Sequence, residues 1–404
     1  MIDPKYFLEK LLQLSHRGTC TPNSHKSAKI IEEEFKKLGL QPHLNEFNTI
    51  RNDKVMEVFL FSFFALSVIL LFFGKIWWSI AFFGLGLFMQ IDPVFPPGFR
   101  FSPRNIFRFF YRGRSENVYA EILPEDKQYK ETIVLASHHD TSRWTIGLKF
   151  MGSIVKNTNI FTLNNKLPFF LRGPYLITNI SICINIVIFF LPLHSIAQII
   201  IGAYILLTYL LTLAMMFHTS IAPFNPGALD NASGVALTMS LASFFKDNKP
   251  KSTRIIFWSH GSEENKTKGF RELFKDANID KQKTAFIVID GIGANILQIN
   301  NGESRGFGSV LYDKKLFEFI ASTIKSKPEF YPIQTSFVPI GTDAGNLVDE
   351  KCRVMASIIS RNEDSFYDHY HQMTDTIDKL NFKTINLCIN FLQYLISSYD
   401  KSVS

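Results

Sequence analysis

The sequence predicts an α/β domain, with a mostly parallel or mixed sheet between layers of helices, that is interrupted by two transmembrane helical hairpins. Three observations carry this prediction. Long apolar runs without charge are confined to two regions of the 404-residue chain, and short apolar runs alternate with helical patterns elsewhere. Polar and titratable side chains follow the short runs where each would end, which predicts a functional site at one edge of the sheet.

The overall composition is close to that of an ordinary globular protein. Hydrophobic residues make up 46% of the chain and charged residues 20%, and 43 basic against 36 acidic side chains give a net charge of +7. This balance excludes a disordered chain, a collagen-like fibre and a small disulfide-stabilised protein. Phenylalanine is unevenly distributed, because 21 of the 40 lie within residues 55–114 and 161–217. The average therefore conceals two kinds of segment.

Each hairpin is predicted from a pair of apolar runs separated by one residue. The runs are Val58–Gly74, Ile76–Ile91, Pro174–Leu193 and Ser195–Phe217. A helix needs about 20 apolar residues to cross a bilayer, so the second pair is long enough and the first is at the lower limit. The alternative is a buried core hairpin of a soluble protein, whose helices would normally carry charges on an outer face. We therefore expect transmembrane hairpins at 55–91 and 174–217.

Basic residues around the first hairpin predict its orientation. Both hairpin turns are short, so the large polar segments are expected on one side of the membrane. The basic side chains on that side are Arg51, Lys54, Arg100, Arg104, Arg108, Arg112 and Arg114. Because such residues are retained in the cytoplasm, we expect a multi-pass integral membrane protein with a cytoplasmic polar domain.

Residues 94–114 combine phenylalanine and arginine directly after the first hairpin. This composition can bind nucleic acid, but its position beside a membrane span favours the lipid headgroup layer, with rings among the acyl chains and guanidinium groups on phosphates. The apolar, lightly basic residues 160–172 precede the second hairpin and have the same interpretation. We expect the lipid bilayer as a partner, and no nucleic acid.

The remaining segments, 1–54, 92–173 and 218–404, are predicted to form the α/β domain together. Asp3-Pro4 is a helix start, because aspartate caps the first turn and proline fits its first position. A second helix is expected from Asn23 or Ser24 to Gly39, followed by a strand that begins near Leu44.

Short apolar runs predict the central strands. Residues 132–136, 254–258 and 285–289 are almost wholly apolar and bounded by polar residues, which is typical of strands buried on both faces. Helical patterns at 234–245 and 314–325 alternate with them. This alternation indicates a mostly parallel sheet covered by helices.

Histidine and carboxylate side chains gather after these strands and in two loops. They are His138, Asp140, Asp230, Glu263, Glu264, Asp290 and His371. Taken singly, each is more simply explained as a capping or hydrogen-bonding group. Together they have the composition of a site for two zinc ions, in which a carboxylate bridges the metals and a position stays open for water.

The order of these groups resembles peptidase family M28, the co-catalytic zinc aminopeptidases. The shared pattern is His-x-Asp, Asp-x-x-Ser-Gly, Glu-Glu, Asp and a late His-x-x-x-Asp-Thr, and the segment Arg17–Pro22 is similar to the family as well. The resemblance implies a zinc-aminopeptidase-like phosphorylase/hydrolase fold. It also implies that the protein removes N-terminal residues from peptides.

The resemblance implies a role for each metal ligand. Asp230 would bridge two zinc ions, with His138 and Asp290 completing one site. Glu264 and His371 would complete the other.

The resemblance also implies roles beside the metals. Glu263 would be the general base, which takes a proton from water and returns it to the departing amine. Asp140 would hold the ring of His138. His139 and His369 are expected to be neighbouring or surface histidines, and His260 is left without a role.

The chain departs from the family in two places. His138 and Asp230, which the family keeps close in sequence, are 92 positions apart here, and the second hairpin occupies the gap. The rim of the active site would then be continuous with the membrane. Where family members often have Ser-Asp followed by His or Tyr, this chain has Thr342-Asp343-Ala344, and alanine cannot donate a hydrogen bond to an oxyanion.

The predicted function is therefore that of a membrane-bound dinuclear zinc metallopeptidase of the aminopeptidase type, acting on peptides. Two alternatives remain. One is a catalytically silent receptor or scaffold with the same fold. The other is glutaminyl cyclisation, which is less favoured because Asp230–Gly234 has the peptidase form. The oligomeric state is left open.

Overall fold

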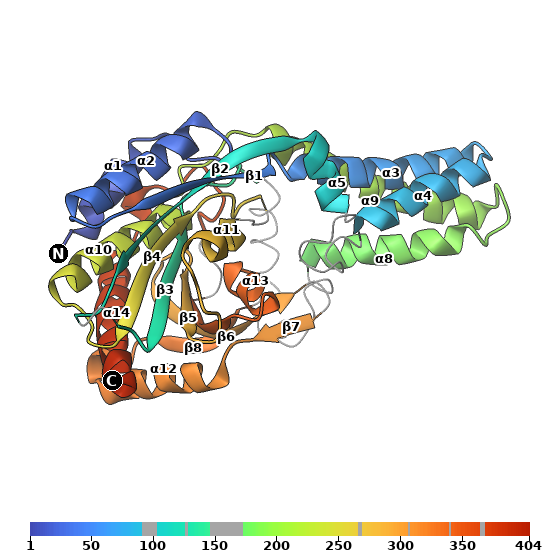
Figure 1. Ribbon diagram of the computed structural model, residues 1–404. Helices are drawn as coiled ribbons and strands as arrows, with labels where there is room; N and C mark the ends of the chain where they lie inside the picture. Colours follow the sequence, from blue (N-terminus) through green and yellow to red (C-terminus); the bar gives the residue numbers. More distant parts are fainter. Residues whose placement is uncertain are drawn as a thin grey trace.

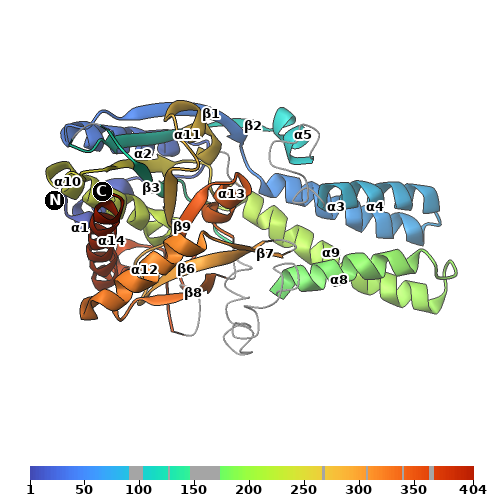
Figure 2. The ribbon, with the colours of Figure 1, turned by 60° about the horizontal axis from the view of Figure 1, so that its bottom comes forward.

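The computed structural model describes residues 1–90, 103–125, 128–145, 173–265, 269–305, 308–338, 341–363 and 368–404. In these residues a central mixed sheet is flanked by helices, and a bundle of apolar helices projects from one end of the α/β domain (Figures 1 and 2). The predicted α/β fold class is confirmed.

The sheet has nine strands among the described residues, in the order β1-β2-β4-β3-β5-β9-β6-β7, with β8 paired to β6. β4, β3, β5 and β9 are parallel neighbours, and β8 is parallel to β6. The pairs β1–β2, β2–β4, β6–β7 and β6–β9 are antiparallel. The strands are β1 (His43–Ile50), β2 (Arg112–Ile122), β3 (Glu131–His138), β4 (Thr253–His260), β5 (Thr284–Ile289), β6 (Ile296–Arg305), β7 (Gly308–Leu311), β8 (Gln334–Val338) and β9 (Arg353–Arg361).

Helices cover both faces of this sheet. Those of the α/β domain are α1 (Pro4–Leu12), α2 (Pro22–Lys37), α10 (Ser233–Asp247), α11 (Gly269–Asp276), α12 (Lys314–Ser326), α13 (Asp343–Asp349) and α14 (Phe382–Val403). The first helix starts as predicted, because the Asp3 side chain accepts a hydrogen bond from the Lys5 N–H. The second begins one residue earlier than expected, with Thr21 as its cap and Pro22 in its first turn.

The central strands lie where the short apolar runs predicted them. Successive side chains of β3 point to opposite faces, so Ile133 and Leu135 join one buried cluster and Val134 and Ala136 another. The first cluster lies under α1, α2, α10 and α14, and the second lies under α11 and α13. A strand buried on both faces cannot alternate polar and apolar residues, which explains its continuous apolar sequence.

The two predicted hairpins form the bundle. The first consists of α3 (Lys54–Phe72) and α4 (Ile76–Gln90), and the second of α8 (Gly173–Ile188) and α9 (Ile196–Ile221). Phe64 on α3 stacks on Tyr209 of α9 at 5.2 Å between ring centroids, so the hairpins pack against each other.

Within the described residues, α3 and α9 are long and apolar enough to cross a membrane. α4 and α8 have 15 and 16 residues, so α8 is shorter than the apolar run that predicts it. The outer surface of the bundle is apolar, and Trp77 is 83% exposed.

The predicted headgroup segment 94–114 is described only from Pro103. Residues Pro103–Phe110 form a short helix, α5, in which Phe107 packs on Phe59 of α3 at 6.0 Å. Arg112–Arg114 belong to β2 and pair with β1, so this part of the segment is sheet. Residues 91–102, and the second such segment at 160–172, lie outside the described residues.

Candidate metal centre

The titratable residues come together at the carboxyl ends of the parallel strands. His138 is the last residue of β3, and Asp290 directly follows β5. Glu264 lies in the loop after β4. Asp230 belongs to the short segment Ala228–Ala232 (η3) that precedes α10, and His371 lies in the loop before the 3-10 turn Ile377–Lys379 (η5). The fold thus brings all five predicted ligands into one site.

The ligand atoms form two groups that share Asp230. His138 Nε2 lies 3.2 Å from Asp230 Oδ1 and 3.3 Å from Asp290 Oδ1. On the other side, His371 Nε2 lies 3.0 Å from Asp230 Oδ2 and 3.4 Å from Glu264 Oε2. In each group the three ligand atoms lie within 4.8 Å of one another. Because each carboxylate oxygen of Asp230 faces a different group, the arrangement fits a pair of metal ions bridged by this residue.

The polar atoms of the site are incompletely satisfied within the protein. Among the described residues, Glu264 Oε1 is buried without a hydrogen-bond partner, and His371 Nε2 has only the crowded carboxylate oxygens of Asp230 and Glu264 beside it. Leaving a buried polar atom without a partner costs about 1–3 kcal/mol. Imidazole nitrogens and carboxylate oxygens are ligands that Zn²⁺ accepts, so bound zinc would satisfy these atoms. The residues present therefore fit the metal.

Burial and crowding alter the protonation of these groups. Burial raises the pKa of Glu264 to about 7, although the neighbouring His371 opposes the change. Burial lowers the pKa of His371, but the carboxylates of Glu264 and Asp230 outweigh it and raise the value to about 10. Burial also raises the pKa of Asp290. Several carboxylates in a small buried volume favour the binding of cations.

Glu263 lies beside the ligands and is held by its backbone. Burial raises the pKa of its carboxyl well above the usual range, and the Asp343 carboxylate raises it further. The N–H of Glu263 donates to Asp140 Oδ1 at 3.1 Å, and the N–H of Glu264 donates to Asp140 Oδ2 at 3.2 Å. Asp140 thus fixes the turn that presents both glutamates.

Asp140 also contacts the His138 ring, which is the contact that its predicted role requires. The ring nitrogen Nδ1 of His138 lies 3.2 Å from the backbone oxygen of Asp140 and 3.5 Å from its carboxylate. The carboxylate in addition accepts hydrogen bonds from the Glu263 and Glu264 N–H groups and from the Thr19 hydroxyl, the last at 2.5 Å. Asp140 thus contacts the His138 ring through both its main chain and its carboxylate, and it holds the glutamate turn through the same carboxylate.

Two buried residues that the sequence analysis did not single out support the Asp230 loop. The Arg17 guanidinium donates to the carbonyl oxygens of His139, Pro226 and Gly227 at 2.9, 2.9 and 2.7 Å. Asp375 accepts the N–H groups of Leu229 at 2.9 Å and Asp230 at 3.2 Å. Both residues lie in segments that carry the family resemblance, and this resemblance could have marked them as candidates for a role at the site.

The second hairpin leaves and re-enters the domain through a closed neck beside the site. The N–H of Asn225 donates to the Ser142 carbonyl at 3.0 Å, and its side chain donates to the Ser142 hydroxyl at 2.8 Å. Arg143 and Phe224 form an antiparallel bridge, with the guanidinium 4.0 Å from the ring centroid. The two ends of the insertion therefore meet.

The other histidines occupy distinct positions. His139 is buried rather than at the surface, burial lowers its pKa to about 3, and its Nδ1 lies 3.1 Å from the Ser259 hydroxyl. His369 is half-buried and contacts Thr374. His260 Nε2 lies 2.9 Å from Asp343 Oδ2, which gives this histidine a buried acidic partner next to the metal centre.

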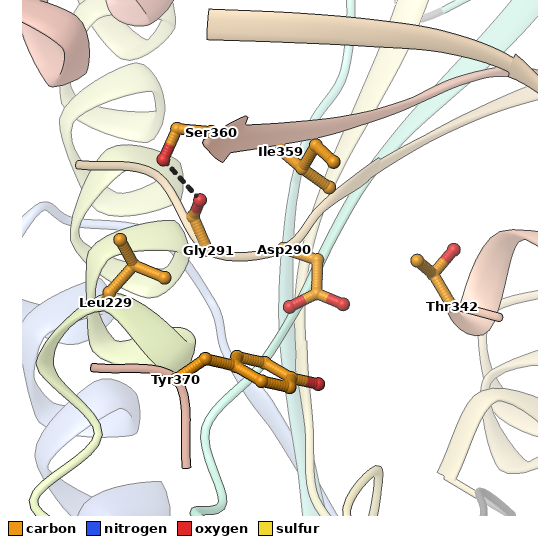
Figure 3. Close-up of a pocket in the computed structure, with 7 residues that line it drawn as sticks. All are labelled: Leu229, Asp290, Gly291, Thr342, Ile359, Ser360 and Tyr370. Carbon is orange, nitrogen blue, oxygen red and sulfur yellow. Dashed lines mark hydrogen bonds between the residues drawn. The ribbon is translucent and has the colours of Figure 1, made fainter. Parts of the chain in front are cut away.

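A small cavity of about 10 Å³ adjoins Asp290. Its lining residues, drawn in Figure 3, are Leu229, Asp290, Gly291, Thr342, Ile359, Ser360 and Tyr370. The Tyr370 ring stacks on His371 at 3.9 Å between centroids and extends below the Asp290 carboxylate (Figure 3). Ala344 is buried at the start of α13. Tyr370 therefore supplies this side of the site with a hydroxyl, which Ala344 lacks.

The chain is similar in fold to several solved structures over nearly its whole length. One is a glutaminyl cyclase from Porphyromonas gingivalis, with a TM-score of 0.55 and 12% identity over 98% of this chain and 97% of that chain. Another is a leucine aminopeptidase precursor from Bacteroides thetaiotaomicron, with a TM-score of 0.54 and 11% identity over 98% and 95%. A Zn-dependent exopeptidase from Parabacteroides distasonis has a TM-score of 0.53 and 10% identity over 98% and 96%. At these identities the likeness is one of fold.

The sequence itself matches one family model. Residues 211–396 match Peptidase family M28, and no curated protein matched the chain. The matched region contains Asp230, Glu264, Asp290 and His371, and it supports a hydrolase of the peptidase class. The resemblance predicted from the motifs is therefore confirmed over residues 211–396, which are similar to peptidase family M28.

Proposed function

We propose that this protein is a membrane-bound dinuclear zinc aminopeptidase that hydrolyses the N-terminal peptide bond of its substrates. The observation that carries the proposal is the pair of buried ligand groups that share Asp230, with Glu263 beside them. The family match and the fold of the Zn-dependent exopeptidase support the same chemistry.

Each ligand group would hold one zinc ion. His138, Asp290 and one oxygen of Asp230 would hold the first, and Glu264, His371 and the other oxygen of Asp230 the second. When bound, the zinc ions would lower the pKa of a water molecule and polarise the scissile carbonyl.

Glu263 would transfer the proton. Its carboxylate would take a proton from the water whose oxygen attacks the scissile carbonyl, and would pass it to the nitrogen as the C–N bond breaks. A general base works best when its pKa is near the working pH, and the buried position of Glu263 raises its pKa in that direction. Asp140 supports this role because it fixes the backbone of the glutamate turn.

The membrane attachment is part of the proposal. We propose that the bundle lies in the lipid bilayer and that the α/β domain faces the cytoplasm. Only 17% of the most apolar window of α9 is buried, which is unlike the core helix of a soluble protein. Exposed Arg112 and Arg114 near the start of the bundle support the cytoplasmic orientation.

The orientation predicts a protease-protection result. A tag at Ser404 should be digested in sealed inside-out vesicles, where the cytoplasmic face is outward, and protected in intact cells until lysis. The measurement is an immunoblot of the tag with and without detergent, with a periplasmic or luminal protein as the sealing control. Digestion of the tag on intact cells would place the domain on the opposite side.

The proposed activity predicts zinc-dependent cleavage of peptides with a free amino terminus. Detergent-purified protein should contain about two zinc ions per chain and should release N-terminal residues, and a chelator should abolish the release until zinc is returned. Peptides with an acetylated amino terminus are the matched control and should remain intact. Metal content by mass spectrometry and product analysis by chromatography provide the measurements.

Other results of this screen would identify the alternatives. Protein without zinc and without peptidase activity would favour the silent receptor or scaffold. Conversion of an N-terminal glutamine to pyroglutamate, with release of ammonia and no cleaved residue, would favour the glutaminyl cyclase alternative, whose fold is also similar.

A further inference from the structure

The ligand-bearing edge of the sheet is joined directly to the apolar helices. α9 ends at Ile221, and Asp230 follows nine positions later. Asn52, between β1 and α3, donates a hydrogen bond to the Ser220 carbonyl at 2.8 Å. The start of the first hairpin and the end of the second are therefore fixed to each other beside the site.

The loop with the catalytic glutamate is tied to the same place. Asn265 Nδ2 donates to the carbonyl oxygens of Ile50 at 2.9 Å and Arg51 at 3.1 Å, directly before α3. The hydroxyls of Thr49 and Ser262 lie 2.6 Å apart in a buried contact. The glutamate turn is thus bonded to the residues that lead into the first hairpin.

Trp144 connects the His371 loop to the second hairpin. Its ring contacts His218 of α9 edge-on at 5.1 Å between centroids. Its indole N–H donates to Gln372 Oε1 at 3.1 Å, and the Thr145 N–H donates to the His371 carbonyl at 3.2 Å. The second hairpin and the residues that lead into the first are therefore in contact with loops that carry the predicted metal ligands.

These contacts hold the site at a constant height above the bundle. Nine residues of fully extended chain span at most about 30 Å, so Asp230 lies no farther than this from the end of α9. The bundle surface, with exposed Trp77, Trp78, Phe190 and Ile196, is suited to acyl chains. A bilayer around the bundle would then fix the height of the metal centre above the membrane surface.

We propose that the substrates are polypeptides anchored in the same membrane, and that trimming stops at a set distance from the bilayer. This inference rests on the proposed aminopeptidase activity. A tether keeps the amino terminus near the site at a millimolar effective concentration. A free peptide would have to be supplied at a millimolar bulk concentration to reach the same value. When the remaining segment becomes too short to span the height, the effective concentration falls to zero.

The height limits the length of the final product. An extended chain advances about 3.3 Å per residue, so a height of up to about 30 Å corresponds to up to about ten residues. Anchored chains that start with different lengths should end with the same segment outside the membrane. Free peptides have no such limit and should be degraded further.

The experiment uses the full-length protein in lipid vesicles. Two peptides with 15 and 25 residues before a C-terminal diacyl anchor are compared with the same peptides without the anchor. We expect at least tenfold faster initial trimming of the anchored peptides. We also expect both to end at one common length of up to about ten residues, measured by mass spectrometry. The Glu263→Gln protein controls for contaminating peptidases.

The outcomes separate this inference from the proposed function. Equal trimming of anchored and free peptides, without a common end length, would overturn the inference and leave the aminopeptidase intact. Faster trimming of the free peptides would do the same. Failure to trim either kind of peptide, with zinc bound, would overturn the proposed function and the inference with it.

Discussion

Replacing Glu263 with glutamine is expected to lower kcat by about 10²–10⁴-fold, because the amide has the same shape but cannot accept the proton of the attacking water. The zinc content should stay at the wild-type level, since Glu263 belongs to neither ligand group. The measurements are steady-state hydrolysis of a free-amine peptide and metal analysis of the same preparation.

A matched control uses an exposed glutamate far from the metal centre. Glu318 on α12 has 64% of its side chain exposed and lies 3.9 Å from Lys314, so Glu318→Gln should leave kcat unchanged. Wild-type turnover by Glu263→Gln would show that another group transfers the proton.

Replacing Asp230 with asparagine is expected to remove both zinc ions and all measurable hydrolysis. Asp230 offers one oxygen to each ligand group, and it is only 2% exposed, so water has little access to replace it. A neutral amide supplies one weak oxygen ligand and cannot bridge two cations. Metal analysis should give close to two ions per chain for the wild type and close to none for the variant.

Two further variants test whether the loss of both zinc ions is specific to the replacement of Asp230. Asp290→Asn removes a ligand of one group, so this variant should retain about one ion. Asp378 follows the His371 loop and has 63% of its side chain exposed, and Asp378→Asn should retain both ions. Full zinc occupancy in Asp230→Asn would contradict a bridging role.

The central strands β3, β4 and β5 could be predicted because burial on both faces requires a continuous run of apolar residues. The edge strand near Leu44 was also predicted, but β6 was not, and its sequence illustrates why. It carries Gln298, Asn300 and Glu303, all of them buried. Asn300 is satisfied by Ser357, and Glu303 accepts the Thr342 hydroxyl at 2.7 Å and the Tyr312 hydroxyl at 2.9 Å. Such partners are distant in sequence, so periodicity alone could not identify this strand.

The hairpin boundaries illustrate a second limit. The apolar run predicted an end at Phe217, but α9 continues through His218, Thr219 and Ser220 to Ile221. These polar residues stay helical because they contact the α/β domain, as the His218–Trp144 and Ser220–Asn52 contacts illustrate. Hydropathy marks where the side chains of a helix stop being apolar, and it does not mark where the helix ends.

The candidate site could be predicted as a set of residues but not as a set of contacts. The motifs identified five side chains that the fold does bring together, whereas their roles as ligands stay predictions. Three features were not predicted. They are the hydrogen bonds from the glutamate turn to Asp140, the hydrogen bond from the Asp230 N–H to Asp375, and the position of the Tyr370 hydroxyl. Each depends on backbone groups or rings that only packing brings near, across as many as 146 positions for Leu229 and Asp375.

The closed neck between Ser142 and Asn225 has a consequence for how such a protein can arise. Because the chain returns to within a hydrogen bond of where it departs, the separation between His138 and Asp230 in space does not depend on the number of residues between them. An apolar hairpin could be gained or lost at this point without disturbing the spacing of the predicted ligands. The position of the insertion, rather than its content, is what preserves the chemistry.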